Sequence, residues 1–153
     1  MARSLLHQHP RYRLDELLGR GASGAVWRAH DYDTGEPVAL KTLRSRSDAD
    51  RVAFEREVRT LSRLHHQSIV RLHDVGRFCG ELYFTMELVR GLSLDRLLTN
   101  PTEASADEIA GLARVVAEAL EALDHVHRSH LVHADLKPAN ILILGGDSDR
   151  DPT

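Results

Sequence analysis

Residues 133–140, His-Ala-Asp-Leu-Lys-Pro-Ala-Asn, combine three chemical groups that suit a phosphoryl transfer. The carboxylate of Asp135 can accept a proton from a hydroxyl group, and the ammonium of Lys137 can neutralise phosphate charge. Asn140 offers a neutral oxygen to a hard cation such as Mg²⁺. The types and spacing of these residues therefore predict a loop that handles a phosphoryl group.

A second candidate site is the glycine-rich run at residues 19–24, Gly-Arg-Gly-Ala-Ser-Gly. Dinucleotide-binding folds share its Gly-x-Gly-x-x-Gly spacing, but their loop leads into a helix. Residues 25–30 have strand character instead, so the run predicts a hairpin, where glycines are often turn residues only. Because Val26 lies two residues beyond the last glycine and the next strand carries Val-Ala-Leu-Lys ending at Lys41, we interpret the run as a loop that covers phosphates.

Lys41 and Lys137 are the only lysines among 20 cationic side chains, and both fall within these motifs. The apolar residues 38–40 predict that the strand of Lys41 is covered on both faces, and a buried ammonium requires a partner. In a helix over residues 50–64, the 100° rotation per residue places Glu57 on the apolar face and Glu55 away from it. We therefore predict an ion pair between Lys41 and Glu57; the alternative is that both glutamates are solvated.

Hydrophobic periodicity predicts a first half rich in strands and a second half rich in helices. The expected strands cover residues 12–18, 25–31, 37–43, 69–75 and 81–86, and the expected helices cover residues 50–64, 93–98 and 107–129. Residues 87–91 form a natural linker, and residues 131–144 return to loop and strand. The longest helix begins with a capping box of Ser105 and Glu108. It carries an apolar stripe formed by Ile109, Leu112, Val116, Leu120 and Leu123.

Length and composition exclude several classes of protein. With 153 residues, 42% of them hydrophobic, the chain can build one good globular core. A formal charge of −3 gives no basic field for nucleic acid, so no nucleic-acid partner is expected. A single cysteine, Cys79, fits a reducing compartment. The sequence has no apolar run of membrane-spanning length, and the apolar segment of residues 1–10 is shorter than a signal peptide requires. We expect a cytoplasmic protein without a membrane segment.

The ten histidines raise the question of a metal site. Four of them lie close together in sequence, at His125, His127, His130 and His133, but no cysteine lies nearby to complete a zinc site. His127 shares a helical stripe with Leu120, which favours a hydrogen-bonded histidine in the core. We assign no histidine as a metal ligand.

Taken together, these motifs make the chain resemble the serine/threonine protein kinases from about residue 12 to residue 144. The resemblance rests on four motifs in the order that the family has them. They are the glycine loop with Val26, the Val-Ala-Leu-Lys strand ending at Lys41, the inward glutamate Glu57, and the loop at residues 133–140. The Lys137-Pro138 pair resembles the serine/threonine branch rather than the tyrosine branch.

The resemblance implies a role for each matching residue. The ATP-binding residues would be Gly19, Arg20, Gly21, Ala22, Ser23, Gly24, Val26, Ala39, Lys41, Glu57, Met86, Glu87, Val89 and Leu142. Among these, Ala39, Val26 and Leu142 would enclose adenine, Met86 would be the gatekeeper, and the backbone of Glu87 and Val89 would bond the adenine edge. Asp135 would be the catalytic base, Lys137 would contact the transferred phosphate, and Asn140 would hold Mg²⁺. The implied reaction transfers the γ-phosphate of ATP to a serine or threonine hydroxyl of a protein substrate.

The implied fold is α+β and two-lobed. It has a complete small lobe, made of a five-stranded antiparallel sheet and one helix, and a partial helical large lobe. We expect a flexible tail at residues 1–11, the small lobe and hinge at residues 12–91, and the partial large lobe at residues 92–153.

Two departures from the family pattern shape the expected function. Ala134 replaces the usual arginine that meets a phosphorylated activation loop, so control by such a phosphate is not expected. No Asp-Phe-Gly follows Asn140, and the late aspartates at residues 147, 149 and 151 fit a polar turn. We therefore expect the chain to be the front part of a kinase domain, with further C-terminal domains missing. We also expect this part to be inactive alone.

Two alternatives remain open at this point. A pseudokinase or nucleotide-binding interaction module would account for the missing metal-binding aspartate. A small-molecule phosphotransferase of the aminoglycoside or choline kinase type also has a small residue between the His and Asp of its loop. Lys137-Pro138 argues against this second alternative, because those enzymes are not expected to carry a lysine there.

Overall fold

The computed structural model describes residues 5–21, 24–43, 47–98, 106–129, 131 and 136–144. The chain divides into two compact units rather than the single core that its length suggests. Unit 1 comprises Met1–Arg63 and Val70–Leu88, and unit 2 comprises Leu64–Ile69 and Val89–Thr153.

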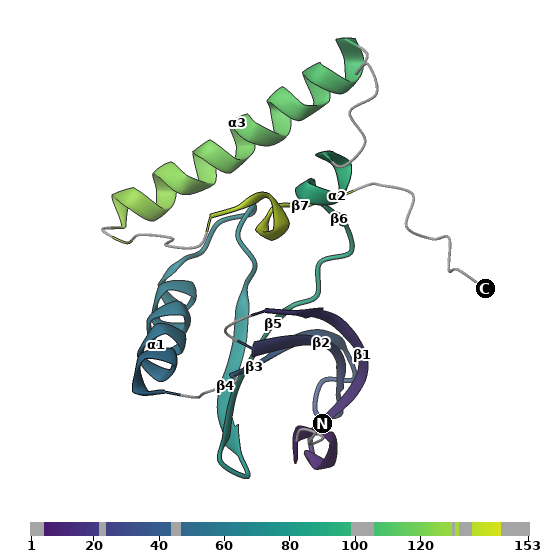
Figure 1. Cartoon of the computed structure of the whole chain (residues 1–153), viewed down its shortest axis with the longest axis vertical. Helices are drawn as coiled ribbons and strands as arrows, with labels where there is room; N and C mark the ends of the chain where they lie inside the picture. Colours follow the sequence, from purple (N-terminus) through teal and green to yellow (C-terminus); the bar gives the residue numbers. More distant parts are fainter. Residues whose placement is uncertain are drawn as a thin grey trace, which may run out of the picture. The chain divides into compact units, whose positions relative to one another are not determined.

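Unit 1 is built on a five-stranded antiparallel sheet with the strand order β1-β2-β3-β5-β4 (Figure 1). Its strands are β1 (Tyr12–Arg20), β2 (Gly24–Asp31), β3 (Pro37–Leu43), β4 (Leu72–Phe78) and β5 (Glu81–Glu87). The helix α1 (Asp48–Arg63) lies between β3 and β4 in sequence. It begins after Ser47, whose hydroxyl oxygen accepts a hydrogen bond from the backbone N–H of Asp50 at 3.2 Å and caps the first turn.

The strand β4 begins three residues later than the expected strand over residues 69–75. The turn after it explains the difference. Cys79 and Gly80 both have positive φ, 49° and 85°, and Phe78 pairs with Glu81 across them. A two-residue hairpin loop of this kind matches the twist of the flanking strands, so the turn fixes where β4 ends.

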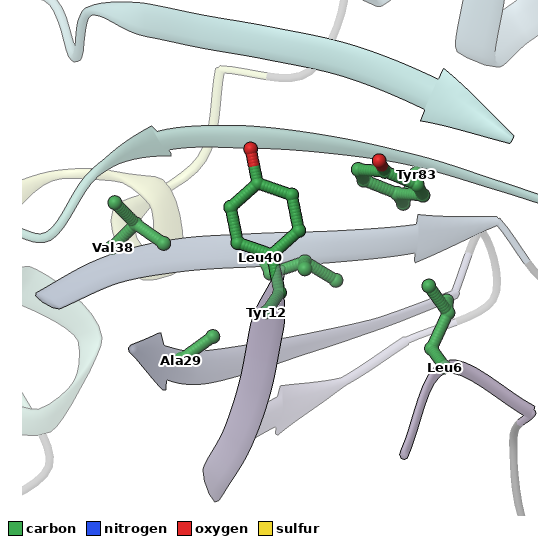
Figure 2. Packing of buried hydrophobic residues seen from close by; sticks show 6 residues of the cluster. All are labelled: Leu6, Tyr12, Ala29, Val38, Leu40 and Tyr83. Atoms are coloured by element: carbon green, nitrogen blue, oxygen red, sulfur yellow. The ribbon is translucent and has the colours of Figure 1, made fainter. Parts of the chain in front are cut away.

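Alternation along the central strand β3 places two apolar cores on opposite faces of the sheet. Leu40 is fully buried on one face, together with Tyr12, Ala29 and Tyr83, whose side chains converge in Figure 2. The other face buries Phe84 and Leu43 against Phe54 of α1. Because successive residues of a strand point to opposite faces, Lys41 shares the face of α1. The prediction that β3 is covered on both sides is confirmed.

Residues before β1 also belong to unit 1. A 3-10 helix, η1 (Leu5–Gln8), places Leu6 in the first core with no exposed surface (Figure 2). In the expected flexible tail over residues 1–11, the described segment from Leu5 onward is therefore packed through Leu6, and residues 1–4 lie outside the described part of the chain. A fully buried leucine stabilises such a segment by roughly 1.5–3 kcal/mol relative to leaving it exposed.

The described residues of unit 2 form a short two-stranded ladder and two α-helices. The strands β6 (Leu92–Ser93) and β7 (Leu142–Ile143) pair antiparallel, α2 is Leu94–Leu98, α3 is Ala106–Arg128, and η2 is a 3-10 turn over Pro138–Asn140. The expected helix over residues 93–98 is thus shortened by the strand β6. Ser105 of the expected capping box lies outside the described residues.

Helix α3 has apolar side chains on two faces. Ala122 and Val126 are buried, whereas the expected stripe is largely exposed at Ile109, Leu112, Val116 and Leu120. The prediction of a core histidine at His127 is wrong, because the stripe that it shares with Leu120 faces solvent. Among the described residues, no helix is long and apolar enough to cross a membrane.

Candidate active site

The sheet register of unit 1 brings several of the predicted site residues onto one face. Val26 pairs with Lys41, and Lys41 pairs in turn with Phe84 on β5. Ala39 pairs with Met86 in the same ladder. Since directly paired residues share a face, Val26, Ala39, Lys41 and Met86 all lie on the face that α1 covers.

The ion pair predicted between Lys41 and Glu57 is confirmed. The Lys41 Nζ donates to both carboxylate oxygens of Glu57, at 2.6 Å to Oε1 and 2.8 Å to Oε2. The Lys41 side chain is 15% exposed and that of Glu57 is 39% exposed, so the ammonium is the more enclosed partner. Glu55 is more exposed, at 59%, in line with its predicted outward position. The pair holds the ammonium at a fixed place on the sheet.

Phe84 supports this pair, and the sequence analysis did not identify it. The Lys41 Nζ lies 5.8 Å from the centroid of the fully buried Phe84 ring, within reach of a cation–π attraction. Phe84 also packs on Phe54 of α1, with ring centroids 5.3 Å apart. The signal in the sequence is the alternation of β5, because Phe84 precedes Met86 by two residues and therefore shares its face.

The glycine loop connects β1 to β2 as the predicted hairpin. Gly19 pairs with Val26, Arg20 pairs with Ala25, and the backbone N–H of Gly21 donates to the carbonyl of Gly24 at 2.9 Å. A Cβ atom added at Gly19 or Gly21 would meet nothing within 4 Å, so packing within the described residues does not explain these glycines. Open space above a glycine backbone leaves room for a ligand to approach closely. Ala22 and Ser23 lie outside the described residues.

A hydrogen bond at the end of β5 limits which backbone group of Glu87 can contact adenine. The backbone N–H of Glu87 donates to the carbonyl of Arg71 at 2.9 Å. The Glu87 carbonyl is therefore the group that this residue can offer to an adenine edge. Val89, the second predicted hinge residue, belongs to unit 2 and is half-buried.

The loop that carries Lys137 and Asn140 is held by the ladder of unit 2. The turn η2 closes with the Asn140 N–H donating to the Lys137 carbonyl at 2.9 Å. Directly after it, the N–H of Leu94 donates to the Ile141 carbonyl at 2.9 Å, and Leu142 pairs with Ser93. The side chains of Lys137 and Asn140 are exposed. Asp135, the predicted catalytic base, lies outside the described residues together with His133 and Ala134.

The described residues contain no cluster of three or more His, Cys, Asp or Glu side chains that could hold a metal ion. Asn140, the predicted metal ligand, lies in the described part of the chain, and its side-chain oxygen has the hard character that Mg²⁺ prefers. A complete Mg²⁺ site needs further oxygens from phosphates or carboxylates.

Comparison with known proteins identifies the class to which this fold and site belong. Residues 12–149 match the protein kinase domain family, and the chain therefore belongs to the protein kinase family. Its relatives include serine/threonine-protein kinases of bacteria. The DNA damage-responsive serine/threonine-protein kinase RqkA of Deinococcus radiodurans is 42% identical over 136 residues, which cover 87% of this chain and 20% of RqkA.

Two Mycobacterium tuberculosis proteins extend the comparison. The serine/threonine-protein kinase PknE is 34% identical over 139 residues, which cover 89% of this chain and 24% of PknE. The crystal structure of the PknI kinase domain superposes with a TM-score of 0.73 at 30% identity, covering 90% of this chain and 56% of that domain. The chain thus spans about a fifth to a quarter of the length of RqkA and PknE, and its fold is that of a kinase small lobe with part of the large lobe.

Proposed function

We propose that the protein is a serine/threonine protein kinase that transfers the γ-phosphate of ATP to a hydroxyl group of a protein substrate. The observation that carries the proposal is the Lys41–Glu57 ion pair, whose ammonium shares a sheet face with Val26, Ala39 and Met86. Family membership and the serine/threonine-protein kinase relatives support the same reaction over small-molecule phosphotransfer.

In this proposal the residues of unit 1 bind and orient the nucleotide. Val26 and Ala39 contact adenine together with Leu142, and the glycine loop at residues 19–24 covers the phosphates with its backbone. Lys41, fixed by Glu57, holds phosphate oxygens in place. The donor set fits ATP, because it combines an apolar surface for a base with an anchored cation and open glycine backbone for phosphates.

The residues of the loop at 133–140 carry the chemistry in this proposal. Asp135 accepts the proton of the attacking hydroxyl, Lys137 neutralises charge on the transferred group, and Asn140 ligates Mg²⁺. When bound, Mg²⁺ neutralises phosphate charge.

We propose a division into a small lobe and hinge up to residue 91 and a partial large lobe from residue 92.

The assignment of Lys41 is tested by titration calorimetry of ATP with the 153-residue chain. We expect Lys41→Ala and Glu57→Gln to weaken binding, because the first removes the cation and the second removes the charge that anchors it. Arg56→Ala is the matched control, since it removes an exposed cation from the same helix and should leave the affinity unchanged. Equal affinity of wild type and Lys41→Ala would contradict the assignment.

The assignment of Asp135 is tested by phosphoryl transfer. We propose that residues 1–153 alone transfer phosphate at or near background, because they contain no Asp-Phe-Gly aspartate for the second Mg²⁺. A polypeptide extended through that segment and the rest of the large lobe should be active without activation-loop phosphorylation, since Ala134 replaces the arginine that such a phosphate meets.

Radiolabelled-ATP assays with this extended polypeptide measure the effect of Asp135→Asn. We expect the substitution to lower the rate on the order of 100-fold or more. Strong Mg²⁺-dependent transfer by residues 1–153 that Asp135→Asn abolishes would contradict the expected inactivity of the short chain. An inert extended polypeptide would favour a pseudokinase instead.

A further inference from the structure

The segment before β1 is fixed to the sheet face opposite Lys41. Leu6 inserts into the core formed by Tyr12, Leu40 and Tyr83, with no exposed surface (Figure 2). His7 contacts Trp27 of β2 edge-on, with ring centroids 5.2 Å apart. Residues 5–10, which we call the N-terminal strap, therefore cover part of this face and end where Arg11 is fixed to the sheet by its ion pair with Asp31.

His9 is the main polar fixing point of the strap. Its Nδ1 accepts hydrogen bonds from the backbone N–H groups of Arg11 and Tyr12, at 3.1 Å and 3.2 Å. Its Nε2 lies 3.1 Å from the hydroxyl oxygen of Tyr83. A neutral imidazole carries one N–H, and because Nδ1 accepts two bonds, the hydrogen must be on Nε2. The Nε2–H then donates to Tyr83.

The surroundings of His9 favour this neutral form. Three aromatic rings, those of Tyr12, Phe78 and Tyr83, lie with centroids 4.7–5.1 Å from the imidazole. Burial lowers the pKa of His9 from its usual 6.5, and the Arg11 guanidinium lowers it further.

One carboxylate opposes this effect on His9. Asp74 on β4 raises the pKa of His9, but less than burial and Arg11 lower it. The charge of Asp74 is largely compensated, because one of its oxygens accepts from Arg11 at 3.0 Å and from the Tyr12 hydroxyl at 3.1 Å.

We propose that His9 is a proton-sensitive latch, whose neutral ring holds the N-terminal strap on the sheet and whose protonated ring releases it. The added proton must go to Nδ1, because Nε2 already carries one. A protonated Nδ1 would point its hydrogen at the N–H groups of Arg11 and Tyr12, so both bonds are lost and two like dipoles face each other. Docking of the strap and a charged His9 therefore exclude one another.

The sign of the pH dependence follows from the same geometry. The docked state holds His9 neutral, whereas the released strap exposes a histidine with its ordinary pKa of 6.5. The released state therefore binds more protons, so docking is complete above this pH and weakens as the pH falls below it. Release at low pH therefore exposes the apolar surface around Leu40 and Tyr83 that the strap covers at neutral pH.

Trp27 provides the measurement, because it is the only tryptophan of the chain and lies under His7. We expect its emission to shift to longer wavelength as the pH falls from about 8 to about 5, with a midpoint below 6.5. His9→Asn keeps an acceptor oxygen near the position of Nδ1 but has no proton to gain, so the wild-type transition should be absent from its emission.

A matched control separates His9 from its neighbour. His7→Asn removes the imidazole that contacts Trp27, and it should change the amplitude of the transition but leave its midpoint. A transition in His9→Asn with the wild-type midpoint, or constant emission of the wild type over this pH range, would overturn the latch.

A second measurement is independent of how the variants fold. Nitrogen-15 NMR of the histidine side chains in the wild-type chain reports which ring nitrogen carries the hydrogen. We expect His9 to be in the Nε2–H form at pH 7.5 and to become doubly protonated only in step with the change in Trp27 emission. An Nδ1–H form at neutral pH would overturn the proposal, since such a ring cannot accept from Arg11 and Tyr12.

Discussion

The two units differ in how completely they bury their apolar side chains. In unit 1 the sheet buries both faces, with Leu40 on one side and Phe84 on the other. In unit 2 the helix α3 buries Val126 but leaves Ile109 and Leu120 each 58% exposed. The residues proposed to bind nucleotide through Lys41 thus stand on a scaffold with its own two-sided core. The loop of the proposed chemistry leads into a two-stranded ladder with two residue pairs.

The largest expected effect tests whether unit 1 is the stable part. Phe84→Ala should lower the free energy of unfolding of unit 1 by roughly 3–5 kcal/mol, because it empties a fully buried aromatic site between β5 and α1. Urea unfolding followed by Trp27 emission measures this change, since the only tryptophan lies in unit 1. Leu120→Ala in unit 2 is the control and should leave that transition in place. Equal losses in the two variants would mean that the units unfold together.

A smaller effect concerns the ion pair between Asp31 and Arg11, the residue that follows the strap. Arg11 donates to both carboxylate oxygens of Asp31 at 2.8 Å, and this guanidinium lowers the pKa of Asp31 from 3.8 to about 2. The stabilisation is therefore complete above pH 3.8 and is lost as the pH falls towards 2. It should be on the order of 2 kcal/mol, and Asp31→Asn should remove it at neutral pH.

Acid and urea unfolding of the wild type and of Asp31→Asn measure the two free energies of unfolding and check this prediction. Asp15→Asn is the matched control, because Asp15 pairs with Arg13, whose side chain is 57% exposed. Exposed pairs contribute little, so this variant should stay within about 0.5 kcal/mol of the wild type. An Asp31→Asn variant with wild-type stability at neutral pH would contradict the assigned role of Arg11.

The exposed face of α3 gives a still smaller effect on stability but a visible one on association. We expect the 153-residue chain to self-associate through Ile109, Leu112, Val116 and Leu120, because a contiguous exposed apolar stripe favours contact between molecules. Ile109→Lys with Leu120→Lys should reduce this association in size-exclusion chromatography and lower the binding of a hydrophobic dye. The unfolding of unit 1 should change by less than about 0.5 kcal/mol. A monomeric wild type that binds no dye would show that the stripe is covered.

A small effect with a defined direction is expected at the β4–β5 turn. Cys79 adopts φ 49°, a conformation in which asparagine is better tolerated than cysteine. Cys79→Asn should therefore stabilise unit 1 by roughly 0.5 kcal/mol, measured by the same urea transition. Cys79→Val is the opposing variant and should destabilise the turn, because a β-branched side chain is disfavoured at positive φ. The reverse order would contradict the turn geometry.

Local chemistry allowed most of unit 1 to be predicted from the sequence. Glycine-containing turns bound the strands, and helical rotation correctly placed Glu57 towards Lys41. Ile69 was a misleading start for β4, because it is apolar but its N–H closes a turn onto the carbonyl of His66. The positive φ angles at Cys79 and Gly80 set the register of β4 against β5 instead. Cysteine is uncommon at such a turn position, so the sequence did not identify this turn.

Contacts between distant residues explain what the sequence analysis missed. The strap depends on His9 meeting Tyr83, which lies 74 residues away, and no local pattern predicts such a bond. His127 was misplaced because helical periodicity identifies an apolar stripe without showing which of two stripes is buried. The role of Phe84 beside Lys41 follows from sheet register, which becomes known only when the strand order is known.

Gly91 carries a consequence for the mutational tolerance of unit 2. A Cβ atom at this position would lie 2.5 Å from the carbonyl oxygen of Ile143 and 3.0 Å from its carbonyl carbon. Both are backbone atoms of β7, so no side-chain rotation can relieve the overlap. In a library of single substitutions, even alanine at position 91 should displace the strand that follows the Lys137–Asn140 turn. If variants at this partly exposed glycine are lost from the active fraction of the library, the cause would be the displacement of a loop about fifty residues further along the chain.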